Sequence, residues 1–473
     1  MDYYGGVSFN WFGDHEITLI KWGDSVDKKI LLVGIGITGF SLARYLTYKK
    51  QPFMMYDTRE LPPQVQEFKN AFPNIEVYCQ DYPKLLLQQV SKILTSPGVA
   101  PDCELFQEAR RQGIVIENDL DCLAEEIKNT PVVAITGSNG KSTVTTWVGE
   151  IAKAAGLAVA VGGNLGTPVL DLFLEKTHYD LWVLELSSFQ LANMRHFNIG
   201  IGTVLNVSPD HLDMHGSMES YIAAKQRVYE FAEQGVFNRE DVATIPKHLL
   251  NKVMSFGLSE PASNLEFGLV KKNGEFYLAQ GNDIWLAVSK LRLKGQHNWL
   301  NAMAACALCD SLGIPKEVII QGLIDFSGLH HRTEWVADIK QVTFINDSKG
   351  TNMGATLAAI QGIGSTMTGK IILIAGGLSK DADFTPMREC LSQYVKQVIL
   401  IGKDAKILEN YWQGAVNMSH ASSLEKAVEQ AFQYAHPGDI VLLSPACASF
   451  DMFNGYEHRG QQFVKIVREL QTC

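Results

Sequence analysis

The sequence predicts an α/β protein with three domains and mainly parallel sheets. A chain of 473 residues is too long for one ordinary core, since a domain holds roughly 150 residues. From Lys28 onwards, short runs of β-branched residues alternate with amphipathic helical segments. This alternation is typical of parallel sheets whose strands are connected by helices.

The composition favours a cytoplasmic protein that acts on small molecules, without a nucleic-acid or membrane partner. A formal net charge of -10 disfavours a large nucleic-acid surface. No apolar run reaches the roughly 18 residues of a membrane span, and the first residues lack the features of a secretory signal. The eight cysteines are then expected to be reduced. Cys306 and Cys309 form a CxxC pattern in an apolar helical stretch, where we expect packing and not redox or metal chemistry.

The first domain is predicted over residues 28–119, after an extension of residues 1–27 that has no clear pattern. In this domain ILLVGIG is expected to form a strand and residues 38–48 a helix. PFMMYD and KILTSPGV are further strand candidates.

The second domain is predicted over residues 120–328 and the third over residues 329–473. PVVAITG, AVAVGG, LWVLELSS and IGTVLNVSP are the strand candidates of the second. A more polar, meandering region follows, in which GEFYLAQGNDIWLAV resembles a hairpin, and helical periodicity runs over residues 298–312. In the third domain VTFINDSKG, IILIAGG, VILIGKD and DIVLLSPA are strand candidates, each followed by a helical pattern.

A first glycine loop indicates a Rossmann-like nucleotide site. Gly34, Gly36 and Gly39 match GxGxxG between a strand and a helix, and Asp57 ends the next strand. Taken alone, the pattern favours a nicotinamide or flavin oxidoreductase. The same backbone amides and acid also suit the diphosphate and sugar of a UDP-sugar, and the glycines alternatively serve only a tight turn.

A second glycine loop, TGSNGKST, resembles a shortened Walker A motif. The usual spacing places a glycine six residues before the lysine, where this chain has Ile135. Gly137 and Gly140 flank the turn, and Lys141 opens a helix whose dipole and N–H groups suit a polyphosphate. ATP fits this place, with Lys141 on its terminal phosphates and the Ser142 hydroxyl on Mg²⁺.

The second loop is similar to the ATP loop of the Mur ligase superfamily, which has this shorter spacing. Further motifs resemble that superfamily in the same order along the chain, from about Lys28 to the C-terminus: GGNLGTP, LELSSFQL, LNVSPDHLDMHG, YIAAKQRVY, GQHNWLNA, HRTEW, NDSKGTN and LLSPACASFDMF. The resemblance implies a UDP-binding Rossmann-like domain, a central P-loop ATPase-like domain and a C-terminal Rossmann-like domain that binds an amino acid.

The resemblance also implies a reaction. ATP would activate the carboxylate of UDP-N-acetylmuramoyl-L-alanine as an acyl phosphate, and the amine of D-glutamate would then displace phosphate to give an amide. ADP and phosphate are released, in a cytoplasmic step of peptidoglycan precursor synthesis carried out by a monomer. Because both steps crowd negative charge, electrostatic stabilisation is the main demand on the site.

Two Mg²⁺ ions are implied, held by Ser142, Glu185, His211 and Lys225. Glu185 is a lone acid in an apolar run, where a salt bridge is the alternative to a metal. His211 and His215 are four residues apart, but Leu212 stands where a zinc protease needs glutamate. His215 is therefore expected at the surface.

Lys225 matches a family lysine that carries a carbamate, which would turn a cation into an anionic metal ligand. The alternative is an ordinary lysine, solvated on the outer face of a helix. A lysine must be neutral to react with CO₂, and burial favours that state.

The remaining implied site residues fall into three groups, and Lys141, Glu185, His211 and Lys225 are the catalytic set. ATP would contact Gly137, Ser138, Asn139, Gly140, Lys141, Ser142, Thr143, Asn298, Arg332 and Asp347. The UDP-substrate would contact Ile37, Thr38, Asp57, Thr58, Arg59, Ser96, Gly98, Asn164, Ser187 and His211. D-glutamate would contact Thr351, Lys380, Ser449 and Phe450.

Other functions explain less of the sequence. An oxidoreductase leaves the lysine loop without a role, and a non-enzymatic nucleotide-binding regulator does not need Glu185, His211 and Lys225 together. Among the ligases, folate polyglutamylation is disfavoured by NDSKGTN. The ligase that adds diaminopimelate typically has a DNPR motif, which is absent from the sequence.

Overall fold

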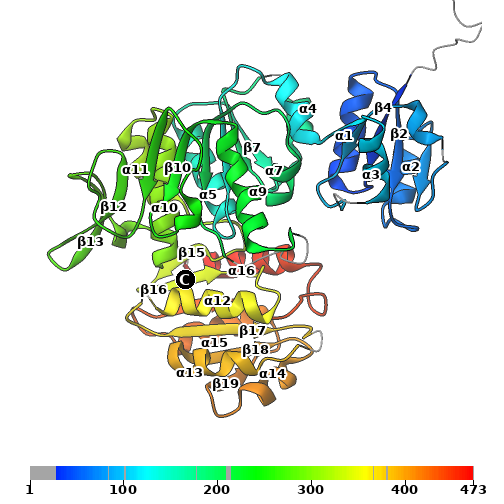
Figure 1. Cartoon of the computed structure of the whole chain (residues 1–473). Coiled ribbons are helices and arrows are strands. Elements are labelled where there is room, and N and C mark those ends of the chain that lie inside the picture. The colour runs from blue at the N-terminus through cyan, green and yellow to red at the C-terminus, as the bar shows by residue number, and fades with distance from the viewer. Residues whose placement is uncertain are drawn as a thin grey trace, which may run out of the picture. The chain divides into compact units, whose positions relative to one another are not determined.

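The computed structural model describes residues 28–471, apart from 84, 101–102, 177, 209–214, 294, 366 and 380–381. The predicted extension, residues 1–27, lies outside the described residues. Two compact units are present: the first holds the chain up to Glu125 with Pro168–Leu174 and Asn193–Arg195, and the second holds the rest. In Figure 1 the first sheet is blue, the second cyan to green and the third yellow to orange. No helix in the described part is long and apolar enough to cross a bilayer.

The first unit contains a parallel sheet with five described strands, in the order β3-β2-β1-β4-β5. Its strands are β1 (Lys29–Val33), β2 (Phe53–Asp57), β3 (Val77–Cys79), β4 (Val90–Thr95) and β5 (Val115–Glu117). Its helices are α1 (Ile37–Tyr48), α2 (Val65–Ala71), α3 (Glu104–Arg111) and α4 (Asp119–Glu126). The strand order reverses between β1 and β4, which is where sheets of this kind bind ligands.

The second sheet has the order β14-β13-β12-β11-β10-β9-β6-β8-β7 in the described chain. The expected strands are β6 (Val132–Thr136), β7 (Val159–Gly163), β8 (Leu181–Glu185), β9 (Ile199–Val204), β13 (Glu275–Gln280) and β14 (Asp283–Ala287). β13 and β14 form the predicted hairpin.

The polar region after β9 was predicted as a meander, and that prediction is wrong. It forms β10 (Ala232–Asn238), β11 (Lys252–Phe256) and β12 (Glu266–Lys272), which continue the sheet in parallel before β13 turns back. Part of each of these strands is exposed and carries polar residues. The sequence therefore lacks the continuous apolar run that is typical of a buried parallel strand.

Helices α5 (Lys141–Ala154), α10 (Gln296–Ser311) and α11 (Lys316–Asp325) pack together over the second sheet. The next helices along the chain after α5 are α6 (Val169–Glu175), which belongs to the first unit up to Leu174, and α7 (Ser188–Asn193) and α9 (Met218–Glu230). Cys306 and Cys309 belong to α10 and are fully buried in the core, so the expectation of packing is confirmed. Burial raises the pKa of both thiols.

The third sheet has the order β15-β16-β20-β17-β18-β19 among the described residues, with only β15 antiparallel. The strands are β15 (Glu334–Ile339), β16 (Val342–Asn346), β17 (Ile371–Gly376), β18 (Val395–Ile401), β19 (Asn417–His420) and β20 (Ile440–Leu443). The helices are α12 (Met353–Gly364), α13 (Arg388–Tyr394), α14 (Ala405–Trp412), α15 (Leu424–Tyr434) and α16 (Tyr456–Gln471). Ile371 and Leu373 enter one core while Ile372 and Ile374 enter another, so both faces of β17 are buried.

Replacing Trp147 should destabilise the second unit. Its ring is fully buried, stacks on Phe326 with centroids 4.5 Å apart, and donates from Nε1 to the Gly322 carbonyl at 3.1 Å. We expect Trp147→Ala to lower the free energy of unfolding by roughly 3–5 kcal/mol, measured by urea unfolding followed by circular dichroism. Leu249→Ala, at a fully exposed side chain, is the control and should change it by less than about 0.5 kcal/mol. Equal midpoints for the two variants would contradict the packing argument.

Candidate functional site

The second glycine loop follows β6 and is held by backbone geometry that requires glycine. Gly140 has φ +82°, and a Cβ there would lie 2.4 Å from Asn301 Oδ1 on α10. The loop is tied to the segment after β9, because Ser138 N donates to Asn206 O at 2.9 Å and Asn139 N to Asn206 Oδ1 at 2.8 Å. The glycine geometry and these two hydrogen bonds therefore define the conformation of the loop without a ligand.

Two lysines meet at one carbonyl oxygen of this loop. Lys141 Nζ donates to Gly137 O at 3.0 Å and to Ser138 O at 2.9 Å. Lys225 Nζ on α9 donates to the same Gly137 O at 2.8 Å and lies 4.5 Å from the centroid of the Tyr221 ring. Lys225 is only 2% exposed, so the alternative of a solvated lysine on an outer helix face is wrong. The two Nζ atoms therefore lie close to the same point of the loop.

Glu185 lies at the end of β8, beside the strand that leads into the loop. Its side chain is 3% exposed, and Oε1 accepts a hydrogen bond from Asn164 Nδ2 at 3.1 Å. Oε2 is buried and has no hydrogen-bond partner among the described residues. A buried carboxylate oxygen without a partner is costly, and a hard cation is the ligand that such an oxygen suits.

The predicted metal ligands can be placed only in part. His211 lies outside the described residues, and no group of three His, Cys, Asp or Glu side chains able to hold a metal occurs among those that are described. Ser142 and Glu185 line the same cavity, whereas Lys225 is buried and does not line it. His215 was expected at the surface, but it is half-buried, stacked on Phe189 at 4.9 Å and bonded to Ser188 Oγ at 2.9 Å.

One cavity of about 670 Å³ collects most of the predicted ATP residues. The loop after β6 and Glu185 line this cavity together with Asn298 and Arg332. The predicted residues lining it are Ser138, Asn139, Gly140, Lys141, Ser142, Thr143, Asn164, Glu185, Asn298 and Arg332. The structure thus brings together a phosphate-type loop, a buried acid and an arginine from distant parts of the sequence.

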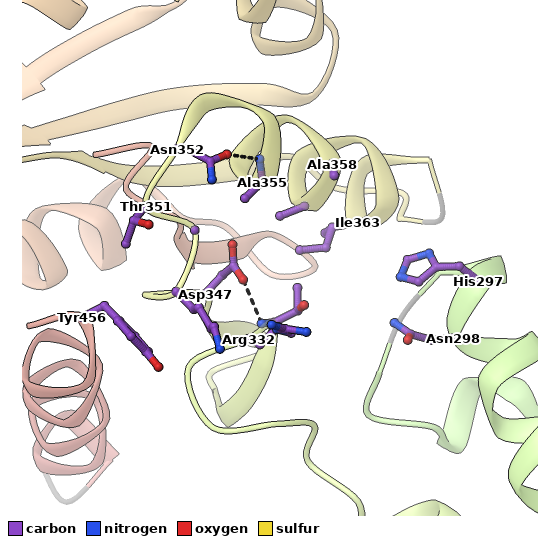
Figure 2. A pocket seen from close by; sticks show the side chains of 14 residues that line it. His297, Asn298, Arg332, Asp347, Thr351, Asn352, Ala355, Ala358, Ile363 and Tyr456 are labelled. Atoms are coloured by element: carbon purple, nitrogen blue, oxygen red, sulfur yellow. Dashed lines mark hydrogen bonds between the residues drawn. The ribbon is translucent and has the colours of Figure 1, made fainter. Parts of the chain in front are cut away.

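A second cavity, of about 540 Å³, adjoins the first through Asn298 and Arg332 (Figure 2). Figure 2 shows Asp347, Arg332 and Thr351 on one side and His297 with Asn298 on the other. Asp347 is buried and accepts from Ser444 Oγ at 2.6 Å and from Thr333 N at 3.1 Å. Burial raises the pKa of Asp347 to about 6, against the opposing hydrogen bond from Ser444.

The predicted D-glutamate residues are not all brought together. Thr351 lines the second cavity, but Ser449 and Phe450 do not, and Lys380 lies outside the described residues. Phe450 is 72% exposed. Tyr456, at the start of α16, lines the cavity and was not predicted, because no quoted motif contains it.

The first glycine loop has its own geometry in the first unit. Asp57 is buried, and its carboxylate accepts from Ile35 N at 2.7 Å and from Arg59 Nε at 2.9 Å and Nη2 at 2.8 Å. Burial alone would raise the pKa of Asp57, but these bonds hold it below its ordinary value. The carboxylate that was expected to bind a sugar hydroxyl therefore orients Arg59 and the loop.

The other predicted UDP residues of this unit follow adjacent strands. Ile37 and Thr38 begin α1 after β1, Thr58 follows β2, and Ser96 and Gly98 follow β4. Ser96 Oγ donates to Gly34 O at 3.1 Å, which joins two of these loops. Ser187 belongs to the second unit, where its hydroxyl donates to Gln190 Oε1 at 3.1 Å, and it does not line the cavities described there.

Doubly wound sheets with glycine loops after their strands, and a lysine-bearing loop facing an arginine and a buried acid, define a nucleotide-binding α/β protein. Three family descriptions match the chain: the MurD-like N-terminal domain at residues 28–117, the Mur ligase middle domain at 135–309 and the Mur ligase glutamate ligase domain at 331–447. The chain belongs to the Mur ligase family. The resemblance and the predicted fold class are confirmed.

Curated relatives agree with this membership, and solved structures share the fold. The chain is 50% identical to UDP-N-acetylmuramoylalanine–D-glutamate ligase of Legionella pneumophila, over 93% of this chain and 99% of that protein. It is 44% identical to the ligase of the same name from Pseudomonas aeruginosa, over 93% and 98% of the two chains. The structure of MurC from Thermotoga maritima, at 19% identity and a TM-score of 0.52 over 93% and 99% of the chains, shares the fold. So does a pseudomurein peptide ligase type C from Methanothermus fervidus, at 19% identity and a TM-score of 0.51 over 94% and 100%.

A side chain at Gly140 should distort the loop. Gly140→Ala combines an unfavourable positive φ with a clash against Asn301, so we expect a loss of about 2 kcal/mol in the free energy of unfolding. Gly156→Ala is the matched control, because Gly156 has φ +91° at the end of α5 with open space around its Cβ position, and it should cost about 1 kcal/mol. Adding Asn301→Ala to Gly140→Ala should recover the difference in urea unfolding. No recovery would mean that the Asn301 contact does not constrain the loop.

Proposed function

We propose that this chain is an ATP-dependent ligase that joins D-glutamate to UDP-N-acetylmuramoyl-L-alanine. The observation that carries the proposal is the cavity in which the Lys141 loop, Glu185 and Arg332 meet, next to a second cavity lined by Asp347 and Thr351. The curated relatives at 44% and 50% identity, which carry the name of this activity, support the choice of substrates.

The residues of the first cavity suit the polyphosphate of ATP. The N-terminus of α5, with Lys141, Ser142 and Thr143, lines this cavity, and Lys141 and Arg332 add two positive charges there. Asn298 would bind polar edges of the purine and Asp347 the ribose hydroxyls. Held in this way, ATP would phosphorylate the substrate carboxylate, and the acyl phosphate would then react with the amine of D-glutamate.

Mg²⁺ would neutralise charge on the transferring phosphoryl group. The unpartnered Oε2 of Glu185 and the Ser142 hydroxyl in the same cavity fit such an ion. We assign His211 and a carbamate on Lys225 to a second ion. Lys225 is buried within hydrogen-bond distance of the loop, which is consistent with a role in the site.

The other two substrates would use separate surfaces. We assign the UDP part to the first unit, through the loops that contain Ile37, Thr58, Arg59 and Ser96, with Asp57 orienting Arg59. Thr351 and Lys380 would bind D-glutamate with Ser449 and Phe450, and Tyr456 joins this set because it lines the same cavity as Thr351. The domain limits at residues 28–119, 120–328 and 329–473, a monomeric state and a cytoplasmic location are part of this proposal.

Phosphate release tests the proposed function. The purified chain is incubated with ATP, Mg²⁺, UDP-N-acetylmuramoyl-L-alanine and D-glutamate, and each component is omitted in turn. We expect full release only with all four, together with an amide product seen by mass spectrometry. Release at the full rate without D-glutamate would refute the coupled ligation.

Glu185→Gln keeps the size of the side chain but removes its charge. If Glu185 holds Mg²⁺, kcat should fall by about 100-fold, and additional Mg²⁺ should restore part of the loss. Asp119→Asn is the control: Asp119 is also buried, with Oδ1 unpartnered in the described residues and its pKa raised to about 6 by burial, but it lies in α4 of the first unit. Its activity should equal that of the wild type. Similar rates for both variants would rule out the assigned role of Glu185.

Lys225→Ala should lose most activity, because it removes the amine on which a carbamate would form. Lys225→Arg keeps the positive charge and cannot be carbamylated in the same way, so it should also be inactive. With ¹³C-labelled bicarbonate, wild-type protein should show a carbamate signal in NMR that both variants lack. Full activity of Lys225→Ala would remove the carbamate from the mechanism.

A further inference from the structure

Arg459, in the first turn of α16, is a buried cation to which the assigned chemistry gives no role. Its side chain is 1% exposed. Nε donates to Ser348 Oγ at 2.9 Å and Nη2 to Ser348 O at 2.9 Å, while Nη1 and Nη2 both reach Cys447 O at 3.3 Å. In the described structure these partners are one hydroxyl and two carbonyl oxygens, with no carboxylate among them.

The two segments that Arg459 joins both support the second cavity. Ser348 lies in the loop after β16, between Asp347 and Thr351, which line that cavity. Cys447 lies in the loop after β20, in which Ser444 Oγ donates to Asp347 Oδ2 at 2.6 Å.

A third segment is attached at the same point. Ser348 Oγ donates to Tyr456 O at 2.8 Å while it accepts from Arg459. Tyr456 begins α16 and lines the cavity one helical turn before Arg459. One guanidinium therefore fastens the two loops and the start of the helix that carry the cavity residues.

The burial of the Arg459 guanidinium costs free energy, and its hydrogen bonds hold two loops in place. They are the loops that contain Ser348 and Cys447. A buried guanidinium bonded to neutral acceptors loses its hydration without gaining an ion pair. Burial lowers the pKa of Arg459 to about 10, which still leaves it charged at neutral pH. Its charge also favours the ionised form of Asp347.

We propose that Arg459 is a positioning residue that fixes Asp347 relative to Thr351 and Tyr456, and so aligns bound nucleotide with bound amino acid without touching either. This inference rests on the assignment of Asp347 to ATP and of Thr351 to D-glutamate in the proposed function. It predicts that loss of Arg459 weakens those two ligands together.

The test compares Arg459→Met and Arg459→Lys with Arg388→Met in the full chain. Arg388 is a matched control because its Nη1 donates to the carbonyls of Tyr411 and Gln413, at 2.5 and 3.1 Å, in the same sheet region but away from the cavity. For each variant we would measure the unfolding midpoint, the Kd of Mg·ADP by calorimetry, and the KM of D-glutamate and of the UDP-substrate.

Arg459→Met should raise the Kd of Mg·ADP and the KM of D-glutamate by about tenfold each, since it removes bonds from a charged donor. The KM of the UDP-substrate should stay within about twofold, because that ligand is assigned to the first unit. Arg459→Lys should show a smaller effect, because it keeps the charge and part of the bonding. Arg388→Met should lower the unfolding midpoint without changing any of the three constants.

Measuring the Kd of Mg·ADP over a pH series distinguishes the effect of the Arg459 charge from that of its hydrogen bonds. The groups that face Asp347 are the charges of Arg332 and Arg459, the Ser444 hydroxyl and the Thr333 N–H. Losing one positive charge raises the pKa of Asp347, so its ionised form disappears at a higher pH as the solution is acidified. The loss of ADP affinity on acidification should therefore begin at higher pH in Arg459→Met than in Arg459→Lys or the wild type.

The proposal is overturned if the Arg459 variants lose stability but keep both ligand constants, as Arg388→Met should. It is equally overturned if the KM of the UDP-substrate rises as much as the other two. Should Arg459→Met fail to fold, Arg459→Lys carries the same comparison. If the wild type does not ligate D-glutamate, the proposed function fails, while the ADP affinities still show whether Arg459 positions the nucleotide loop.

Discussion

The site depends on the parallel pairing of β6 with β8 and β9. Ile135 lies opposite Glu185 in one pairing, and Thr136 lies opposite Val204 in the other. Because parallel strands end at the same edge of a sheet, the phosphate loop, the buried acid and the segment that binds the loop all leave the sheet together. A shift of one residue in the pairing of β8 with β6 would point Glu185 to the opposite face of the sheet.

The fold could be predicted where both faces of a strand are buried, as in β17, because such strands are continuously apolar. It could not be predicted for β10 to β12, whose exposed positions carry polar residues. Lys225 shows the limit of the same reasoning for a side chain. Its helix contains enough polar residues to suggest solvent, and only the tertiary structure places its ammonium group on Gly137 O.

The candidate site, like the fold, could be predicted from the sequence only in part. Glycine spacing indicated the loop, and an isolated acid in an apolar run indicated Glu185, whereas Asn298 and Arg332 were implied only by the resemblance of their motifs to the family. Motifs do not show which side chains line a cavity: Phe450, in a quoted motif, is 72% exposed and does not line the second cavity, whereas Tyr456, outside the quoted motifs, does. Nor do motifs show that a charged group already has a partner within the protein, as the Asp57 carboxylate has in Arg59.

The stack of Trp147 on Phe326 links the helix of the phosphate loop to the segment that leads, six residues later, to Arg332. Gly322 allows α11 to approach α5 this closely, because a Cβ at position 322 would lie 2.5 Å from the Ile151 side chain. Substitutions at these positions in α5 and α11 are therefore not independent during divergence. A substitution on one helix is expected to persist among relatives only with a compensating substitution on the other. Covariation between α5 and α11 would therefore indicate that this contact keeps the phosphate loop aligned with Arg332.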